Sequence, residues 1–212
     1  MRPRGVIFDF NGTLSHDEPV LCRIYCELFA EYGRPISERD YYDVLSGLAE
    51  HTIAEACLGV GDPRIPVFVR ERIDRYKRAA GDGSAIPAAV REAVRYAGGR
   101  ARLAIVSGAA REEIVPAVAA AGLGDVLGVV VADDDVRSGK PHPESYLLAL
   151  EALGVDGAEA LVFEDTEAGI ASAKAAGTRV VAVTGTQPKE RLAAADQIVD
   201  AIDVALLRSL LG

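Results

Sequence analysis

The sequence is short of positive charge. It holds 23 lysine and arginine residues against 32 aspartate and glutamate residues, which gives a formal net charge of −9 at pH 7. The resulting electrostatic field repels nucleic acids and anionic membrane surfaces, because both present dense negative charge. We therefore expect no nucleic-acid or membrane partner, and a small anionic substrate would require a local positive site.

Long apolar runs and cysteine motifs are also missing. The longest apolar region, residues 114–132, is broken by glycines and an aspartate, so it does not predict a membrane span. Residues 6–10 are too few for the apolar region of a signal peptide. The three cysteines, Cys22, Cys26 and Cys57, lack the spacing of a zinc site and are interpreted as packing residues in a reducing compartment. These observations predict a soluble cytoplasmic protein.

What the chain does contain is an alternation of strand and helix patterns. Half of its 212 residues are apolar, enough for one sizeable α/β domain with an insertion. Short runs rich in β-branched residues cover residues 5–10, 102–106, 127–131, 160–163 and 179–183. Helical spacing of apolar residues covers residues 88–97, 112–121, 143–153 and 167–176. Continuously apolar strands suit a sheet covered on both faces. The predicted fold class is therefore α/β, with a doubly wound parallel sheet.

Residues 15–84 interrupt this alternation. They contain no convincing strand, but apolar residues recur at helical spacing over residues 20–29, 38–48, 50–58 and 66–79. The pattern predicts a helical cap, residues 15–84, inserted after the first strand of an α/β core made of residues 1–14 and 85–212. Ligands of open parallel sheets bind outside the carboxyl ends of the strands. We expect the cap to cover that crevice.

Polar residues follow the predicted strands where those strands meet at one edge of the sheet. They are Asp9 and Asn11 after the first strand, Ser107 and Gly108 after the second, Glu164 and Asp165 at the end of the fourth, and Lys140 at the start of the helix before the fourth. Two carboxylates from different strands can hold Mg²⁺, which prefers oxygen ligands. A hydroxyl, backbone N–H groups and an ammonium group can bind phosphate. The sequence therefore predicts Mg²⁺ and a phosphorylated small molecule as cofactor and substrate.

The same residues resemble the motifs of the haloacid dehalogenase superfamily. The resemblance is to the Rossmann-like branch with a helical cap after the first strand, which includes phosphoglycolate phosphatases and β-phosphoglucomutases. Residues 9–13, DFNGT, resemble the family's DxDxT motif except at its second aspartate. The other three motifs of the family are matched in order by residues 103–108, 139–143 and 162–170.

The resemblance implies a role for each matched residue. Asp9 is expected to be the nucleophile that forms an aspartyl-phosphate. Asp9, the backbone carbonyl of Asn11 and Asp165 are expected to bind Mg²⁺. A metal-bound water is expected to connect the ion to Glu164. Ser107, the amide of Gly108, Lys140 and Asn11 are expected to bind the transferring phosphoryl group. Gly47 resembles the specificity-loop glycine of the cap, which predicts that residues 48–51 face the substrate.

Asn11 departs from the family's chemistry. The family's second aspartate protonates the departing oxygen and then deprotonates the water that hydrolyses the aspartyl-phosphate, whereas an amide has no proton to exchange near neutral pH. Four explanations remain open. The substrate has a weakly basic leaving group; His16, the nearest titratable residue, replaces the aspartate; the protein binds or senses phosphorylated ligands without turnover; or the asparagine is a deliberate substitution.

The function predicted first is a Mg²⁺-dependent phosphatase acting on a small phosphorylated metabolite. A phosphate-ligand binding or regulatory protein is the alternative outside enzymology. A sugar-phosphate mutase ranks lower, because transfer between two alcohols depends even more on the missing proton shuttle. Neither the substrate nor the oligomeric state follows from the sequence, since cap residues set specificity and their orientation depends on closure.

Overall fold

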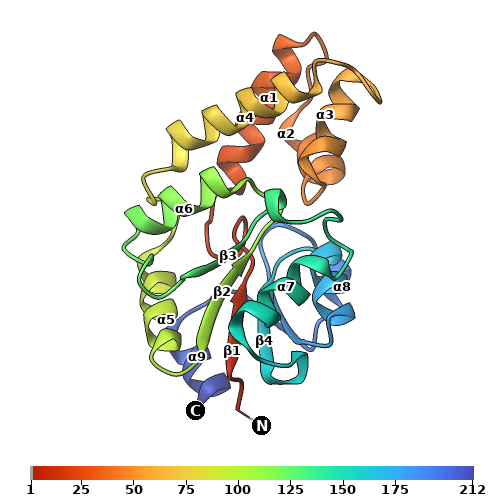
Figure 1. Ribbon diagram of the computed structural model, residues 1–212. Helices are drawn as coiled ribbons and strands as arrows, with labels where there is room; N and C mark the ends of the chain where they lie inside the picture. The colour runs from red at the N-terminus through yellow and green to blue at the C-terminus, as the bar shows by residue number, and fades with distance from the viewer. Residues whose placement is uncertain (1) are drawn as a thin grey trace.

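The computed structural model describes residues 2–212 and contains a central parallel sheet between two layers of helices (Figure 1). The sheet runs in the order β3-β2-β1-β4-β5-β6, and every neighbouring pair is parallel. The prediction of a doubly wound parallel sheet is therefore confirmed. The strands are β1 (Gly5–Phe8), β2 (Arg102–Val106), β3 (Val129–Val131), β4 (Ala160–Glu164), β5 (Arg179–Val183) and β6 (Gln197–Val199).

Helices cover both faces of the sheet. Figure 1 shows α5 (Ala88–Gly98), α6 (Arg111–Ala120) and α9 (Val204–Leu211) on one side, and α7 (Glu144–Leu153) and α8 (Glu167–Ala175) on the other. Side chains of a strand alternate between faces. Val6 and Phe8 accordingly pack in the cluster that includes α5 and α9, while Ile7 packs in the cluster that includes α7 and α8. Because β1 is buried on both faces, the loop after it is held firmly at the edge of the sheet.

The helices inserted after β1 lie beyond the carboxyl ends of the strands, at the top of Figure 1. Leu21, Tyr25 and Leu28 of α1 recur at spacings of three and four and are buried, and the Tyr25 ring stacks on that of Phe68 in α4 at 6.4 Å between centroids. The division into a core and a cap at residues 15 and 84 stays a prediction. The inserted helices are α1 (Glu18–Glu31), α2 (Glu38–Asp40), a π-helical turn (Tyr41–Leu45), α3 (Glu50–Leu58) and α4 (Ile65–Ala80).

Several predicted boundaries differ from the observed ones. The first strand ends at Phe8 rather than residue 10, because the chain turns through Gly12, whose φ is +75°. Lys140 does not start a helix: α7 begins at Glu144, after Pro141 and Pro143, whose missing N–H groups disfavour a helix interior. The third strand begins at residue 129 rather than 127. The helix predicted over residues 38–48 is divided into α2 and the π-helical turn.

Two elements had no counterpart in the sequence prediction. Strand β6 has only three residues and forms the edge of the sheet beside β5, and α9 follows it near the C-terminus. Short 3₁₀ turns also occur at Asp133–Asp135, Gly157–Glu159 and Lys189–Leu192. All three cysteines are free, as expected of packing residues. Within residues 2–212, no helix has the length and apolar character required to span a membrane.

Candidate active site

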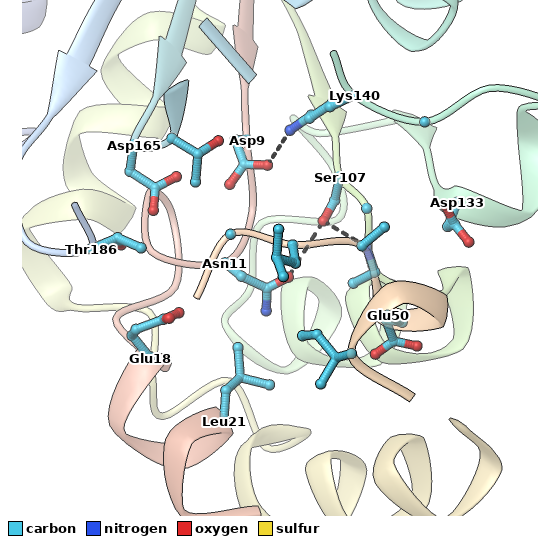
Figure 2. Close-up of a pocket in the computed structure, with 18 of the residues that line it drawn as sticks. Asp9, Asn11, Glu18, Leu21, Glu50, Ser107, Asp133, Lys140, Asp165 and Thr186 are labelled. Atoms are coloured by element: carbon cyan, nitrogen blue, oxygen red, sulfur yellow. Dashed lines mark hydrogen bonds and ion pairs between the residues drawn. The ribbon is translucent and has the colours of Figure 1, made fainter. Parts of the chain in front are cut away.

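A cavity of about 140 Å³ lies between the carboxyl ends of the strands and the inserted helices. Six of the seven polar residues predicted at the strand ends line it, and Figure 2 shows several of them pointing into one space. Glu164 lies behind the residues that line the cavity and is fully buried. The residues that line the cavity from this side are Asp9, Asn11, Ser107, Gly108, Lys140 and Asp165.

Lys140 holds two carboxylates at the base of the cavity. Its Nζ lies 2.5 Å from Asp9 Oδ1 and 2.5 Å from Glu164 Oε1. Burial raises the pKa of Asp9 to about 7, although the ammonium group of Lys140 opposes this shift. Burial also opposes the charge on Lys140, but Asp9 and Glu164 raise its pKa above the usual value. Lys140 therefore stays charged and stabilises the carboxylate form of Asp9.

Glu164 accepts hydrogen bonds at both of its carboxylate oxygens. Its Oε1 accepts hydrogen bonds from Lys140 and, at 2.9 Å, from the Tyr146 hydroxyl. Its Oε2 accepts from the backbone N–H of Asp165 and from both the N–H and the hydroxyl of Thr166. Glu164 thus fixes the position of Lys140 from behind. Tyr146 was missed in the sequence, where it is one apolar position among several on α7.

Asp165 is bonded on one side only. Its Oδ1 accepts a hydrogen bond from the Thr13 hydroxyl at 3.0 Å, whereas its buried Oδ2 has no hydrogen-bond partner. Burial raises the pKa of Asp165 well above its usual value, and the negative charges of Asp9 and Glu164 raise it further. An unpartnered buried carboxylate oxygen next to a second carboxylate fits a cation, because a positive ion would relieve both the desolvation and the repulsion.

Carboxylates alone would not complete a metal site at this edge of the sheet. No group of three or more His, Cys, Asp or Glu side chains arranged to hold an ion occurs in residues 2–212. Asp9 and Asp165 could supply two oxygen donors to an ion, and backbone carbonyls or water, which Mg²⁺ accepts readily, would have to supply the rest. The donor set therefore fits Mg²⁺ better than a transition metal, which would favour imidazole or thiolate.

Asn11 lies beside Ser107, and its side-chain amide is also hydrogen-bonded to Asp17. The Ser107 hydroxyl is 3.4 Å from Asn11 Oδ1, and Asn11 Nδ2 donates to Asp17 at 2.9 Å. Ser107 Oγ also accepts the N–H of Ala109 at 3.1 Å, which orients the start of the turn before α6. His16 is exposed and is not among the residues lining the cavity in the part of the chain the structure describes.

The inserted helices supply an acidic wall opposite the strands. Glu18 of α1 accepts hydrogen bonds from Tyr41 and Ser46, at 3.0 and 2.6 Å, and burial raises its pKa. Gly47, Leu48, Ala49 and Glu50 line the cavity, so the segment predicted to face the substrate reaches it up to residue 50. Asp133, in an exposed 3₁₀ turn, lines it from the strand side.

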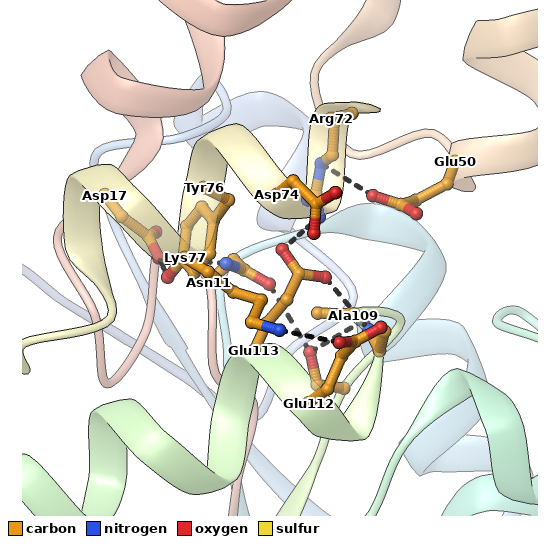
Figure 3. A network of polar contacts seen from close by, with 12 residues as sticks. Asn11, Asp17, Glu50, Arg72, Asp74, Tyr76, Lys77, Ala109, Glu112 and Glu113 are labelled. Carbon is orange, nitrogen blue, oxygen red and sulfur yellow. Dashed lines mark hydrogen bonds and ion pairs between the residues drawn. The ribbon is translucent and has the colours of Figure 1, made fainter. Parts of the chain in front are cut away.

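Arg72 of α4 links the inserted helices to α6. It lines the cavity, is only 4% exposed, and forms ion pairs with Glu50 at 2.6 Å and with Glu113 of α6 (Figure 3). Burial raises the pKa of Glu50 to about 7 against the opposing effect of Arg72. No sequence signal identified Arg72, because its partners come from two other helices.

Comparison with known proteins shows the family of the chain. Residues 3–177 match the family model described as haloacid dehalogenase-like hydrolase. The chain is 34% identical to protein CbbY of Rhodobacter capsulatus over 85% of each chain. It is 32% identical to the phosphorylated carbohydrates phosphatase of Thermotoga maritima, over 82% of this chain and 81% of the relative.

A solved structure has the same fold. The crystal structure of CbbY from Rhodobacter sphaeroides in complex with phosphate superposes with a TM-score of 0.86 at 25% identity, covering 98% of this chain and 99% of that one. The arrangement of sheet and inserted helices is therefore shared over nearly the whole length of both proteins.

Proposed function

The chain belongs to the haloacid dehalogenase-like hydrolases, and from that membership we propose that it is a Mg²⁺-dependent phosphatase of small phosphorylated sugars. The observation that carries the proposal is the pairing of Asp9 with Lys140 at 2.5 Å, next to the unpartnered Oδ2 of Asp165. Phosphoryl transfer to aspartate requires a nucleophilic carboxylate, a positive charge beside it such as the ammonium group of Lys140, and a carboxylate oxygen free to bind a metal ion.

Catalysis proceeds in two displacements at phosphorus. A carboxylate oxygen of Asp9 attacks the phosphorus atom, and the bond from phosphorus to the sugar oxygen breaks with its electron pair on that oxygen. Water then attacks the aspartyl-phosphate, and the bond from phosphorus to Asp9 breaks to release inorganic phosphate. Ser107 and the Gly108 amide bind phosphoryl oxygens, and Lys140 neutralises charge between them and Asp9.

Mg²⁺ would be held by Asp9, Asp165 and the backbone carbonyl of Asn11. When bound, it supplies charge neutralisation between the carboxylate nucleophile and the phosphoryl dianion. Glu164 acts through its contacts with Lys140 and Tyr146, which keep the ammonium group directed at Asp9. A water-mediated contact of Glu164 with the ion stays a prediction.

Asn11 slows both displacements. Its amide neither protonates the departing sugar oxygen nor activates the water, and such assistance is typically worth roughly 10²–10⁴ in rate. The loss of rate is smallest when the leaving oxygen is a weak base, because such an oxygen needs little protonation. We therefore expect aryl and acyl phosphates to turn over faster than alkyl phosphates.

The acidic wall of the inserted helices, together with Asp133 on the strand side, supports a sugar as the rest of the substrate. Glu18, Glu50 and Asp133 face the cavity, and carboxylates accept hydrogen bonds from hydroxyl groups. The Thermotoga maritima relative, which is named for phosphorylated carbohydrates, agrees with this substrate class. A mutase is disfavoured by Asn11, since both of its half-reactions need the proton shuttle.

The test is phosphate release from a panel of sugar phosphates, p-nitrophenyl phosphate and acetyl phosphate, with and without Mg²⁺. We expect Mg²⁺-dependent release that is lost in Asp9→Asn. Saturable binding of a sugar phosphate without any release would favour the binding or regulatory alternative instead.

A further inference from the structure

The side chain of Asp17 is turned away from the helix it precedes. Asp17 occupies the N-cap position of α1, where an aspartate usually accepts a hydrogen bond from an N–H of the first helical turn. No such bond forms here. The carboxylate instead faces the loop that follows β1, and it is completely buried.

Asp17 is bonded to three groups from two parts of the fold. It accepts from Asn11 Nδ2 at 2.9 Å and from the backbone N–H of Gly12 at 3.3 Å. It also accepts from the Tyr76 hydroxyl of α4, and Figure 3 shows Tyr76 and Asn11 converging on it. Asp17 thus connects the loop carrying the predicted nucleophile to the inserted helices.

This environment determines which side chain fits at position 11. Asp17 accepts a hydrogen bond from each of its three partners, so the group that faces it at position 11 must be a donor. The amide of asparagine meets that demand and leaves its oxygen directed at Ser107, 3.4 Å away. An aspartate at position 11 would place a second carboxylate oxygen about where Nδ2 now lies, against the fully buried carboxylate of Asp17.

We propose that Asp17 is the positioning residue for Asn11, and that this pair, rather than position 11 alone, excludes the aspartate typical of the family. Asp17 touches no reacting atom, and it acts by orienting the Asn11 amide. A reciprocal exchange, Asn11→Asp with Asp17→Asn, keeps one donor and one carboxylate in contact and moves the carboxylate to the cavity wall. The kinetic part of this proposal rests on the proposed phosphatase function.

Melting temperatures of four proteins test the pairing without any assay of activity. They are the unaltered protein, Asn11→Asp, Asp17→Asn and the exchanged double variant. We expect Asn11→Asp to melt at least about 4 °C below the unaltered protein. The double variant should recover most of that loss. Asp17→Ser provides a second neutral replacement if Asp17→Asn does not fold, and Asp125→Asn, an exposed aspartate in a turn, should leave the melting temperature unchanged.

Turnover rates distinguish a positioning role of Asp17 from a purely structural one. With an alkyl phosphate and Mg²⁺, the exchanged variant should turn over at least about tenfold faster than Asn11→Asp alone. The gain should be smaller with p-nitrophenyl phosphate, because its leaving oxygen needs less protonation. Restored packing by itself would raise both rates equally.

Two results would overturn the pairing. One is a change in melting temperature in the double variant that equals the sum of the changes in the two single variants. The other is an Asn11→Asp protein that matches the exchanged variant in stability and turnover. If none of the four proteins releases phosphate, the proposed function fails. The melting temperatures then still decide whether Asp17 and Asn11 are coupled.

Discussion

The ammonium nitrogen of Lys140 lies 2.5 Å from Asp9 Oδ1, although 131 residues separate the two in the chain. The Lys140 side chain is 14% exposed and is also paired with the fully buried Glu164. Removing the cation would leave two buried carboxylates without their shared counter-charge. Because the penalty for stranding buried charges is large, this pair is where a single substitution should affect both folding and turnover.

Lys140→Met should lower the free energy of unfolding by about 3–5 kcal/mol and abolish measurable phosphate release. Denaturant unfolding and a phosphate assay measure the two effects. Lys174→Met is the matched control, because Lys174 pairs with Asp196 at 2.7 Å on the surface, where such a pair is worth at most about 1 kcal/mol. Equal losses in the two variants would contradict a buried charge cluster around Lys140.

Gly12→Ala should reduce activity far more than the strain of placing alanine at a φ of +75° explains. A Cβ at this position would come 2.0 Å from Asp165 Oδ2 and 2.4 Å from Thr186 Oγ1. Both atoms border the predicted metal site, so we expect a loss of activity of about 100-fold or more.

Gly33→Ala isolates the backbone contribution of that substitution. Gly33 has a φ of +77°, close to the +75° of Gly12, but a Cβ there meets no atom within 4 Å. The Gly33 variant should lose about 1 kcal/mol of stability and keep its activity. Similar activities of the two variants would show that the space beside Asp165 is not needed.

Glu50 should make stability depend on pH. Its pKa is about 7 in the folded protein, against an ordinary value of 4.5, so between these values the folded state binds more protons than the unfolded state. The free energy of unfolding therefore falls as pH rises from about 5 to 8. The contribution of this one carboxyl is up to about 3 kcal/mol.

Glu50→Gln removes one of the groups that titrate here, Asp9 being another with a pKa of about 7, and should reduce the slope of this part of the profile relative to the unaltered protein. Glu151→Gln, an exposed position on α7, should leave the profile as it was. Urea unfolding at several pH values measures both. A Glu50→Gln protein with the unaltered pH dependence would contradict the raised pKa.

The convergence of the strand-end residues could be predicted because it follows from sequence order. Asp9, Ser107 and Asp165 come directly after apolar strands or at their ends, and parallel strands bring such positions to one edge. Strand β6 escaped prediction because three residues at an edge, only partly buried, carry little periodic signal.

The residues facing the strands from the helices could not be predicted in this way. Arg72, Glu18 and Asp17 acquire their roles from contacts between separate segments of the chain, and each is unremarkable in its own segment. Glu113 illustrates the point: in sequence it is one of two acidic residues in the first turn of α6, and only the packing of α4 against α6 makes it a partner of Arg72.

The central claim, that Asp9 is phosphorylated and that Asn11 slows the release of phosphate from it, is tested most directly by mass analysis of protein quenched during turnover. p-Nitrophenyl phosphate, whose leaving oxygen needs little protonation, is mixed with the Mg²⁺-loaded protein, and peptides containing residue 9 are examined. The first displacement is then fast while the attack of water still lacks a base, so the account predicts a phosphorylated Asp9 peptide that accumulates early, with a burst of p-nitrophenol, and no such peptide in Asp9→Asn. Steady phosphate release without any phosphorylated Asp9, or release that persists in Asp9→Asn, would contradict it.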